Sequence, residues 1–216
     1  MTSFLLKSRL IVSLTAFTAR SLGRASGVRQ STSIQASRAL RTQSLCRASF
    51  SGNDPSAKAQ QLFDQGLQKW NTDDVQGALE CYQQSIWTAA TGDAYYNIAN
   101  CYLQLGKHQS AVDAWKKSLE LSPGRADAHV NLANVYALIL KRHDEALAHY
   151  ENALNLEPKD GQIHYNFAVV LDSMGNLDKA IEHYKIAVEN GTTVAQKNLR
   201  NAMARKLGQQ LKEEPK

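Results

Sequence analysis

The feature that most constrains this chain is a segment that recurs with a period of about 34 residues, a length typical of helical repeats. It reads YYNIANCYLQLG at 95–106, HVNLANVYALIL at 129–140 and HYNFAVVLDSMG at 164–175. A second segment led by alanine follows each copy, and an earlier copy carries the same alanine. These alanines are Ala78, Ala111, Ala146 and Ala180, so the copies follow one another at nearly equal spacing. This periodicity indicates pairs of helices that stack on one another.

Small and aromatic residues recur at fixed places inside each copy. The small residues stand in the first helix of a pair, where they let the two helices approach closely, and the aromatic rings of the second helix fill the space between pairs. A single pair cannot bury this surface, so neighbouring pairs must stack. The small residues are Gly66, Ala99, Ala133 and Ala168, and the aromatic ones are Tyr82, Trp115, Tyr150 and Tyr184.

These repeats resemble the tetratricopeptide repeat (TPR) family, in which each unit is a helix-turn-helix. The likeness covers about residues 59–191 and is close in the copy at 92–125. That copy matches the family pattern at Tyr95, Ile98, Ala99, Tyr102, Gly106, Ala111, Trp115, Ser118 and Pro123. The resemblance implies an all-α fold, a right-handed TPR superhelix or α-solenoid. Its four repeats within 55–191 are expected at about 59–91, 92–125, 126–160 and 161–191.

Two places depart from the family pattern. The first repeat has Gln65 and Lys69 where a leucine and a tyrosine are usual, which favours an atypical N-terminal cap. The third repeat has one extra residue and reads Leu140-Lys141-Arg142-His143 where a glycine turn is usual. We therefore expect its turn to be longer than the others.

The C-terminal segment at 192–212 is predicted to be a capping helix. Leu199, Met203, Leu207 and Leu211 are spaced four apart, so they share one helix face, and the other faces carry lysine and arginine. We expect the apolar stripe to lie on the last repeat, because the end of a solenoid otherwise exposes its core. The alternative is a basic amphipathic helix on an anionic membrane surface.

The segment at 1–54 is predicted to be a mitochondrial transit peptide. Residues 1–53 contain no Asp or Glu, eight Lys or Arg and sixteen Ser or Thr, a composition typical of organellar leaders. Chloroplast and secretory leaders are the alternatives. Residues 10–19, the apolar stretch between two arginines, are too short for a membrane anchor. The expected location is the matrix or the periphery of the inner membrane.

The rest of the chain lacks the charge that nucleic acid binding needs. Residues 55–216 carry 17 basic and 19 acidic side chains, so no basic surplus is available to neutralise phosphates. We therefore expect no nucleic acid partner.

A ladder of asparagines is the candidate site. In a TPR superhelix the first helix of each pair lines the concave groove, and amides there can donate to and accept from the backbone of an extended ligand. The resemblance extends to the asparagine ladder of O-linked N-acetylglucosamine transferases, which implies the same binding mode. The alternative is that the amides only hydrate the face or bond between repeats. The candidate groove residues are Tyr96, Asn97, Asn100, Asn131, Asn134, Tyr165 and Asn166.

The sequence contains no constellation that indicates an enzyme. His143 and His149 are six apart and miss the spacing of two zinc ligands on one helix face, while His129 and His164 open adjacent repeats and are expected to be ordinary packing residues. No phosphate loop, nucleophile elbow or Cys-x-x-Cys pair is present. The groove also lacks the cations of the carboxylate clamp found in chaperone-binding TPR proteins. No catalytic residue, metal, cofactor or small-molecule substrate is expected.

The predicted function is that of a non-catalytic protein-binding module in mitochondria. It would act as an adaptor, an assembly factor or a chaperone-like binder, holding an extended segment or a helix of a protein partner in the concave groove. The alternatives are a permanent structural subunit of a larger mitochondrial complex and a peripheral membrane protein that uses the C-terminal helix. Membrane association is not the favoured reading.

Overall fold

The computed structural model describes residues 54–213 and consists there of helices joined by short turns. The predicted transit peptide lies outside the described residues, apart from Asp54. The described residues form two compact units, 54–114 and 115–213. The helices are α3 (Pro55–Asn71), α4 (Val75–Thr88), α5 (Gly92–Gln104), α6 (His108–Leu121), α7 (Ala126–Val135), η3 (Tyr136–Leu140), α8 (His143–Leu156), α9 (Gly161–Ser173), α10 (Leu177–Glu189) and α11 (Ala195–Glu213).

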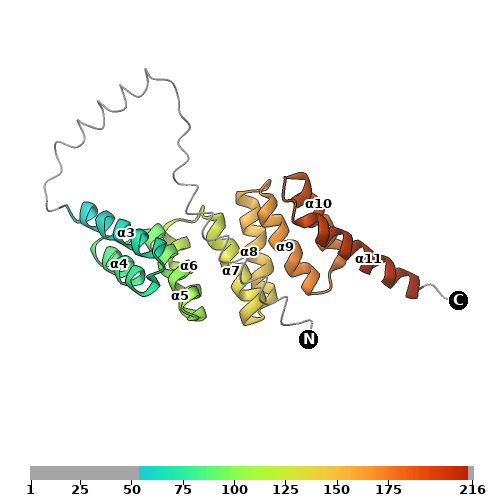
Figure 1. The fold of residues 1–216 in the computed structure, drawn as a ribbon, viewed down its shortest axis with the longest axis horizontal. Coiled ribbons are helices and arrows are strands. Elements are labelled where there is room, and N and C mark those ends of the chain that lie inside the picture. The colour runs from blue at the N-terminus through green and yellow to red at the C-terminus, as the bar shows by residue number, and fades with distance from the viewer. Residues whose placement is uncertain (1–53, 214–216) are drawn as a thin grey trace, which may run out of the picture. The chain divides into compact units, whose positions relative to one another are not determined.

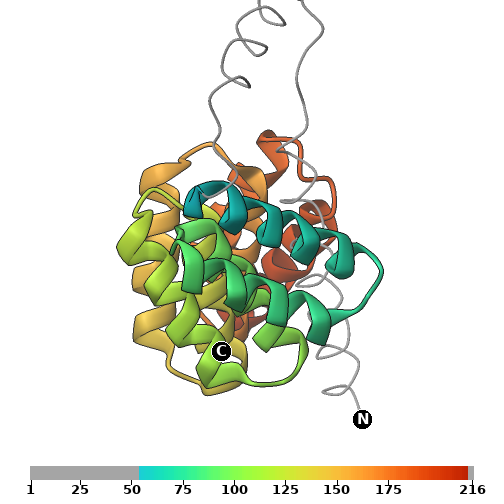
Figure 2. The ribbon, with the colours of Figure 1, turned by 90° about the vertical axis from the view of Figure 1, so that its left-hand side faces the viewer.

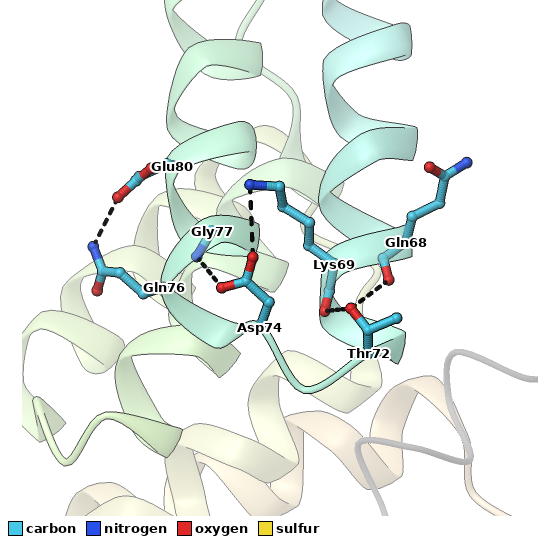
Figure 3. A network of polar contacts seen from close by, with 7 residues as sticks. All are labelled: Gln68, Lys69, Thr72, Asp74, Gln76, Gly77 and Glu80. Atoms are coloured by element: carbon cyan, nitrogen blue, oxygen red, sulfur yellow. Dashed lines mark hydrogen bonds and ion pairs between the residues drawn. The ribbon is translucent and has the colours of Figure 1, made fainter.

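In the first unit, α3 packs against α4 and α4 packs against α5 (Figure 1; Figure 2). The turn between α3 and α4 is held by side chains near its ends (Figure 3). Asp74 accepts a 2.9 Å hydrogen bond from the Gly77 backbone N–H, and it lies 3.6 Å from the Lys69 ammonium. The Thr72 hydroxyl donates to the Lys69 carbonyl at 2.9 Å. These contacts satisfy backbone groups that helix ends otherwise leave without partners.

In the second unit, α7 packs on α8, α8 on α9, α9 on α10 and α10 on α11 (Figure 1). The starts of α9 and α10 are capped by side chains. Asp160 accepts from the Gln162 and Ile163 backbone N–H groups at 2.7 and 3.1 Å, and Asn176 accepts from Lys179 at 3.3 Å. The described residues of this unit therefore repeat one helix-turn-helix design.

The repeated small and aromatic residues form the core, as the period predicts. The alanines that lead each second helix are fully buried, and so are those of the first helices from α5 onward. The aromatic residues of the second helices are no more than 1% exposed. The same spacing extends to Ala202 of α11, which follows Ala168 by one period and is also fully buried. Helix α11 therefore occupies the place of the first helix of a further repeat.

The extra residue of the third repeat is absorbed inside the first helix, not in the turn. The last five residues of that helix, η3, are π-helical, and a π-helical turn accommodates one additional residue. Lys141 then takes the left-handed conformation, with φ 59°, that Gly106 and Gly175 take in the neighbouring repeats, and the next helix begins two residues later in all three. The expectation of a longer turn was wrong, because the helix widened to keep the turn unchanged.

Gly66 is predicted to be intolerant of a side chain. A Cβ atom at this position would lie 2.5 Å from Cε1 of the buried Tyr82 ring, which itself packs against Phe63. Gly66→Ala should lower the free energy of unfolding by about 1–3 kcal/mol despite the higher helix propensity of alanine. Urea unfolding measures this change.

Gly208 in α11 is the matched control. A Cβ atom there would meet nothing within 4 Å, so Gly208→Ala should be neutral or stabilise by up to about 1 kcal/mol. Equal effects of the two substitutions would contradict the close approach of α3 and α4 at Gly66.

Candidate functional site

Most of the predicted groove amides are buried. In the first unit, Tyr96, Asn97 and Asn100 are 2%, 6% and 2% exposed, and the Asn97 amide donates to the Asp93 carbonyl at 3.1 Å. In the second unit, Asn131 and Asn134 are 0% and 5% exposed. The expectation that these four amides project into an open groove is therefore corrected. Their side chains lie within the packing of the helices, and their role as ligand-binding groups stays a prediction.

Asn134 has a defined structural partner. Its side-chain oxygen accepts a buried hydrogen bond from the Tyr150 hydroxyl, which joins α7 to α8. The Tyr150 ring in turn stacks on Phe167 of α9, with centroids 4.9 Å apart. Burial raises the pKa of Tyr150, so the hydroxyl keeps its proton and acts as the donor. This hydrogen bond joins the two helices of one repeat, and the Tyr150 ring then contacts the next repeat. The bond is therefore neither of the two roles that the sequence left open for the asparagines.

Tyr165 and Asn166 on α9 are the predicted site residues that remain accessible, since both are only partly buried. The Asn166 side-chain oxygen accepts from the Gln162 amide at 3.1 Å, so its own N–H groups can reach another partner. The Tyr165 hydroxyl accepts from the Asn198 amide of α11 at 3.3 Å. Tyr165 and the partly buried Val169 are four residues apart and share a helix face. This α9 face combines an aromatic ring, an apolar side chain and an amide.

Two histidine pairs lie beside these helices, and sequence reasoning missed them. The Nδ1 atoms of His129 and His149 are 2.9 Å apart, and those of His164 and His183 are 2.8 Å apart. Each pair joins the first and second helices of one repeat. His129 and His164, expected to be ordinary packing residues, thus contact histidines of their own repeats. The detectable signal was the recurrence of both histidines one repeat later.

The environment of His129, His149 and His183 favours the neutral imidazole. Burial lowers the pKa of His129, and burial together with His129 and Lys116 lowers the pKa of His149 to about 4. Burial and His164 likewise lower the pKa of His183. Each Nδ1···Nδ1 hydrogen bond needs one donor and one acceptor, so a proton on the acceptor would break it.

Three other classes of site find little support in the described residues, namely a metal site, a reactive thiol and a membrane-spanning helix. Within residues 54–213 no group of three or more His, Cys, Asp or Glu is placed to hold a metal ion. Cys81 and Cys101 are free and buried, and burial raises the pKa of Cys101 to about 12. A thiol with a raised pKa is a poor nucleophile. Among the helices of this part, none is long and apolar enough to cross a membrane.

Family comparison identifies the repeats. Two tetratricopeptide repeat profiles match the chain, one at residues 92–125 and one at 124–191. The fold prediction is confirmed, because the solved structures that resemble this one include TPR proteins. MamA from Desulfovibrio magneticus RS-1 aligns with TM-score 0.62 and 22% identity over 69% of this chain and 85% of that one. YrrB, described as a TPR protein with an unusual peptide-binding site, aligns with TM-score 0.57 and 22% identity over 67% and 76%.

Curated relatives share segments of the repeats. The Hsp70-Hsp90 organising protein of Plasmodium falciparum is 48% identical over 50 residues, 23% of this chain and 9% of that protein. The TPR and J domain-containing co-chaperone DNJ1 of Cryptococcus neoformans is 37% identical over 75 residues, 34% and 14% of the two chains. Small glutamine-rich TPR-containing protein 2 of Mycosarcoma maydis is 29% identical over 106 residues, 48% and 30%. The chain thus spans less than a third of the length of these relatives.

Proposed function

Residues 92–191 of this chain belong to the tetratricopeptide repeat family, and on that premise we propose that the protein is a non-catalytic, protein-binding module of mitochondria. TPR proteins mediate interactions between proteins. The finer proposal is that of an adaptor, an assembly factor or a chaperone-like binder. It is supported by the co-chaperone and Hsp70-Hsp90 organising proteins among the relatives and by the acid-free leader at 1–53.

The observation that carries the proposal is the accessible face of α9. Tyr165, Asn166 and Val169 offer apolar contact beside an amide, which suits an extended segment or a helix of a partner without demanding charge on it. The contact surface is narrower than the sequence predicted, because the asparagines of α5 and α7 lie inside the packing.

Asn166→Arg should reduce recovery of protein partners at least about tenfold, because an arginine there places a long charged side chain on the proposed contact face. The measurement is quantitative co-purification of the tagged full-length chain from intact mitochondria. Asn152→Arg is the matched control. Asn152 is exposed on α8, outside the proposed face, so this variant should recover partners like the wild-type chain.

The same experiment separates a binder from a permanent subunit. A changing, sub-stoichiometric set of partners lost in Asn166→Arg supports the binding module. A constant equimolar set that survives Asn166→Arg would replace this proposal by a structural subunit that uses other surfaces. Thermal unfolding of both variants shows whether either substitution acts by unfolding the chain.

A further inference from the structure

Helix α11 carries an exposed apolar stripe. Met203, Leu207 and Leu211 are 48%, 57% and 64% exposed, although each is a large hydrophobic residue. Spacings of four residues place them along one side of the helix. The predicted stripe also contains Leu199, which is partly buried. The expectation that the stripe lies on the last repeat is contradicted at Met203, Leu207 and Leu211. The side chains of these three residues therefore contribute little to the packing of α11 on the repeats.

A different face of α11 packs on the repeats. Ala195 and Ala202 are fully buried, the Asn198 amide donates to Tyr165, and α11 contacts α10. Arg205 forms an ion pair with Asp172 of α9, and Lys206 forms one with Asp178 of α10. With 3.6 residues per turn, Ala195 and Ala202 project about a quarter turn or more from Met203 and farther from Leu207 and Leu211. The small and polar residues thus attach the helix and leave the apolar stripe outward.

The charge of α11 is positive along the helix up to its last residue, Glu213. Residues 195–212 contain five Lys or Arg and no Asp or Glu. Arg205 and Lys206 are used in the ion pairs above, whereas Lys197, Arg200 and Lys212 are exposed. Arg200 projects between Leu207 and Leu211 on the helical wheel, so positive charge and apolar side chains share the outward face. A second copy of this face would bring like charges together, which disfavours self-association through it.

We propose that the outward face of α11 docks on an anionic lipid surface. A basic amphipathic helix lies in the plane of a membrane interface with its apolar side chains at the boundary of the acyl region and its cations near the headgroups. The mode is peripheral. It is independent of the protein-binding face on α9, so each proposal can fail without the other.

Two full-length variants test this docking. Met203→Gln/Leu207→Gln/Leu211→Gln removes the apolar stripe, and Lys197→Gln/Arg200→Gln/Lys212→Gln removes the exposed cations. The measurement is flotation with vesicles of phosphatidylcholine containing phosphatidylglycerol, compared with vesicles of phosphatidylcholine alone. The wild-type chain should float with the anionic vesicles only. Each variant should reduce that binding at least about tenfold, and raised salt should weaken wild-type binding.

Matched controls replace exposed residues elsewhere in the second unit. Leu121→Gln/Leu156→Gln/Met174→Gln removes three exposed apolar side chains from other elements, and Lys159→Gln/Lys179→Gln/Lys185→Gln removes three exposed lysines. Both controls should bind like the wild-type chain. The basic leader is present in every protein, so the difference between variants reports on α11. Equal binding by the wild-type chain and both α11 variants, or no binding to anionic vesicles, would overturn the proposal.

Discussion

Tyr150→Ala is expected to lower the free energy of unfolding of the second unit by about 3–5 kcal/mol. The Tyr150 side chain is fully buried, its ring stacks on Phe167, and its hydroxyl donates to Asn134. Removing the ring leaves a cavity at the place where α8 contacts α7 and α9. Urea unfolding followed by circular dichroism measures the loss.

Tyr150→Phe separates the ring from its hydroxyl. The ring packing stays, but the buried Asn134 oxygen loses its donor, so we expect a smaller loss of about 1–3 kcal/mol. Asn134→Ala combined with Tyr150→Phe should cost less than the sum of the two single changes, because both remove the same hydrogen bond. Additive losses, or a neutral Tyr150→Phe, would show that Asn134 does not stabilise the stack.

Acidification from pH 6.5 to pH 4 is expected to destabilise the second unit by an amount on the order of 3 kcal/mol for His149 alone. The folded chain holds the pKa of His149 at about 4, below the ordinary value of 6.5. The unfolded chain therefore takes up a proton that the folded chain refuses, so stability falls as pH falls through this window. His129 and His183, whose pKa values are also lowered, act in the same direction.

Carboxylates titrate in part of the same pH range, so the effect of the histidines is isolated by comparing the pH profiles of the wild-type chain and a histidine variant. His149→Gln/His183→Gln removes one titrating partner from each pair, so the difference in stability between pH 6.5 and pH 4 should shrink. Denaturant unfolding at a series of pH values gives both profiles. If the variant loses as much stability between pH 6.5 and pH 4 as the wild-type chain does, the histidine pairs take up protons in the folded chain without destabilising it.

The repeat design could be predicted from sequence because its signals are local and recur. Ala78, Ala111, Ala146 and Ala180 fix the period, and a residue that is small in every copy has little use except at a helix contact. The resemblance added the family, which the profile matches confirm at residues 92–191, and the similar solved structures confirm the fold. The starts of α4, α9 and α10 follow equally local chemistry, since Asp74, Asp160 and Asn176 cap the helices that they precede.

The burial of side chains at the candidate site could not be predicted in the same way. An asparagine suits either a solvated face or an internal hydrogen bond, and the choice at Asn134 depends on where Tyr150 of the next helix lies. Met203, Leu207 and Leu211 have the spacing of a packed helix face, yet they are exposed. The face of α11 that packs on the repeats instead carries the small residue Ala202, which is fully buried. The inserted residue near Lys141 could enter the turn or the helix, and only the backbone geometry distinguishes these.

Site-specific photo-crosslinking tests the central claim most directly, namely that partners bind the accessible face of α9. A photoreactive residue placed at position 166 of the full-length chain should form covalent adducts with protein partners in intact mitochondria. The same residue at position 152, exposed on α8, should form few. Adducts that arise at position 152 and are absent at position 166 would contradict the claim.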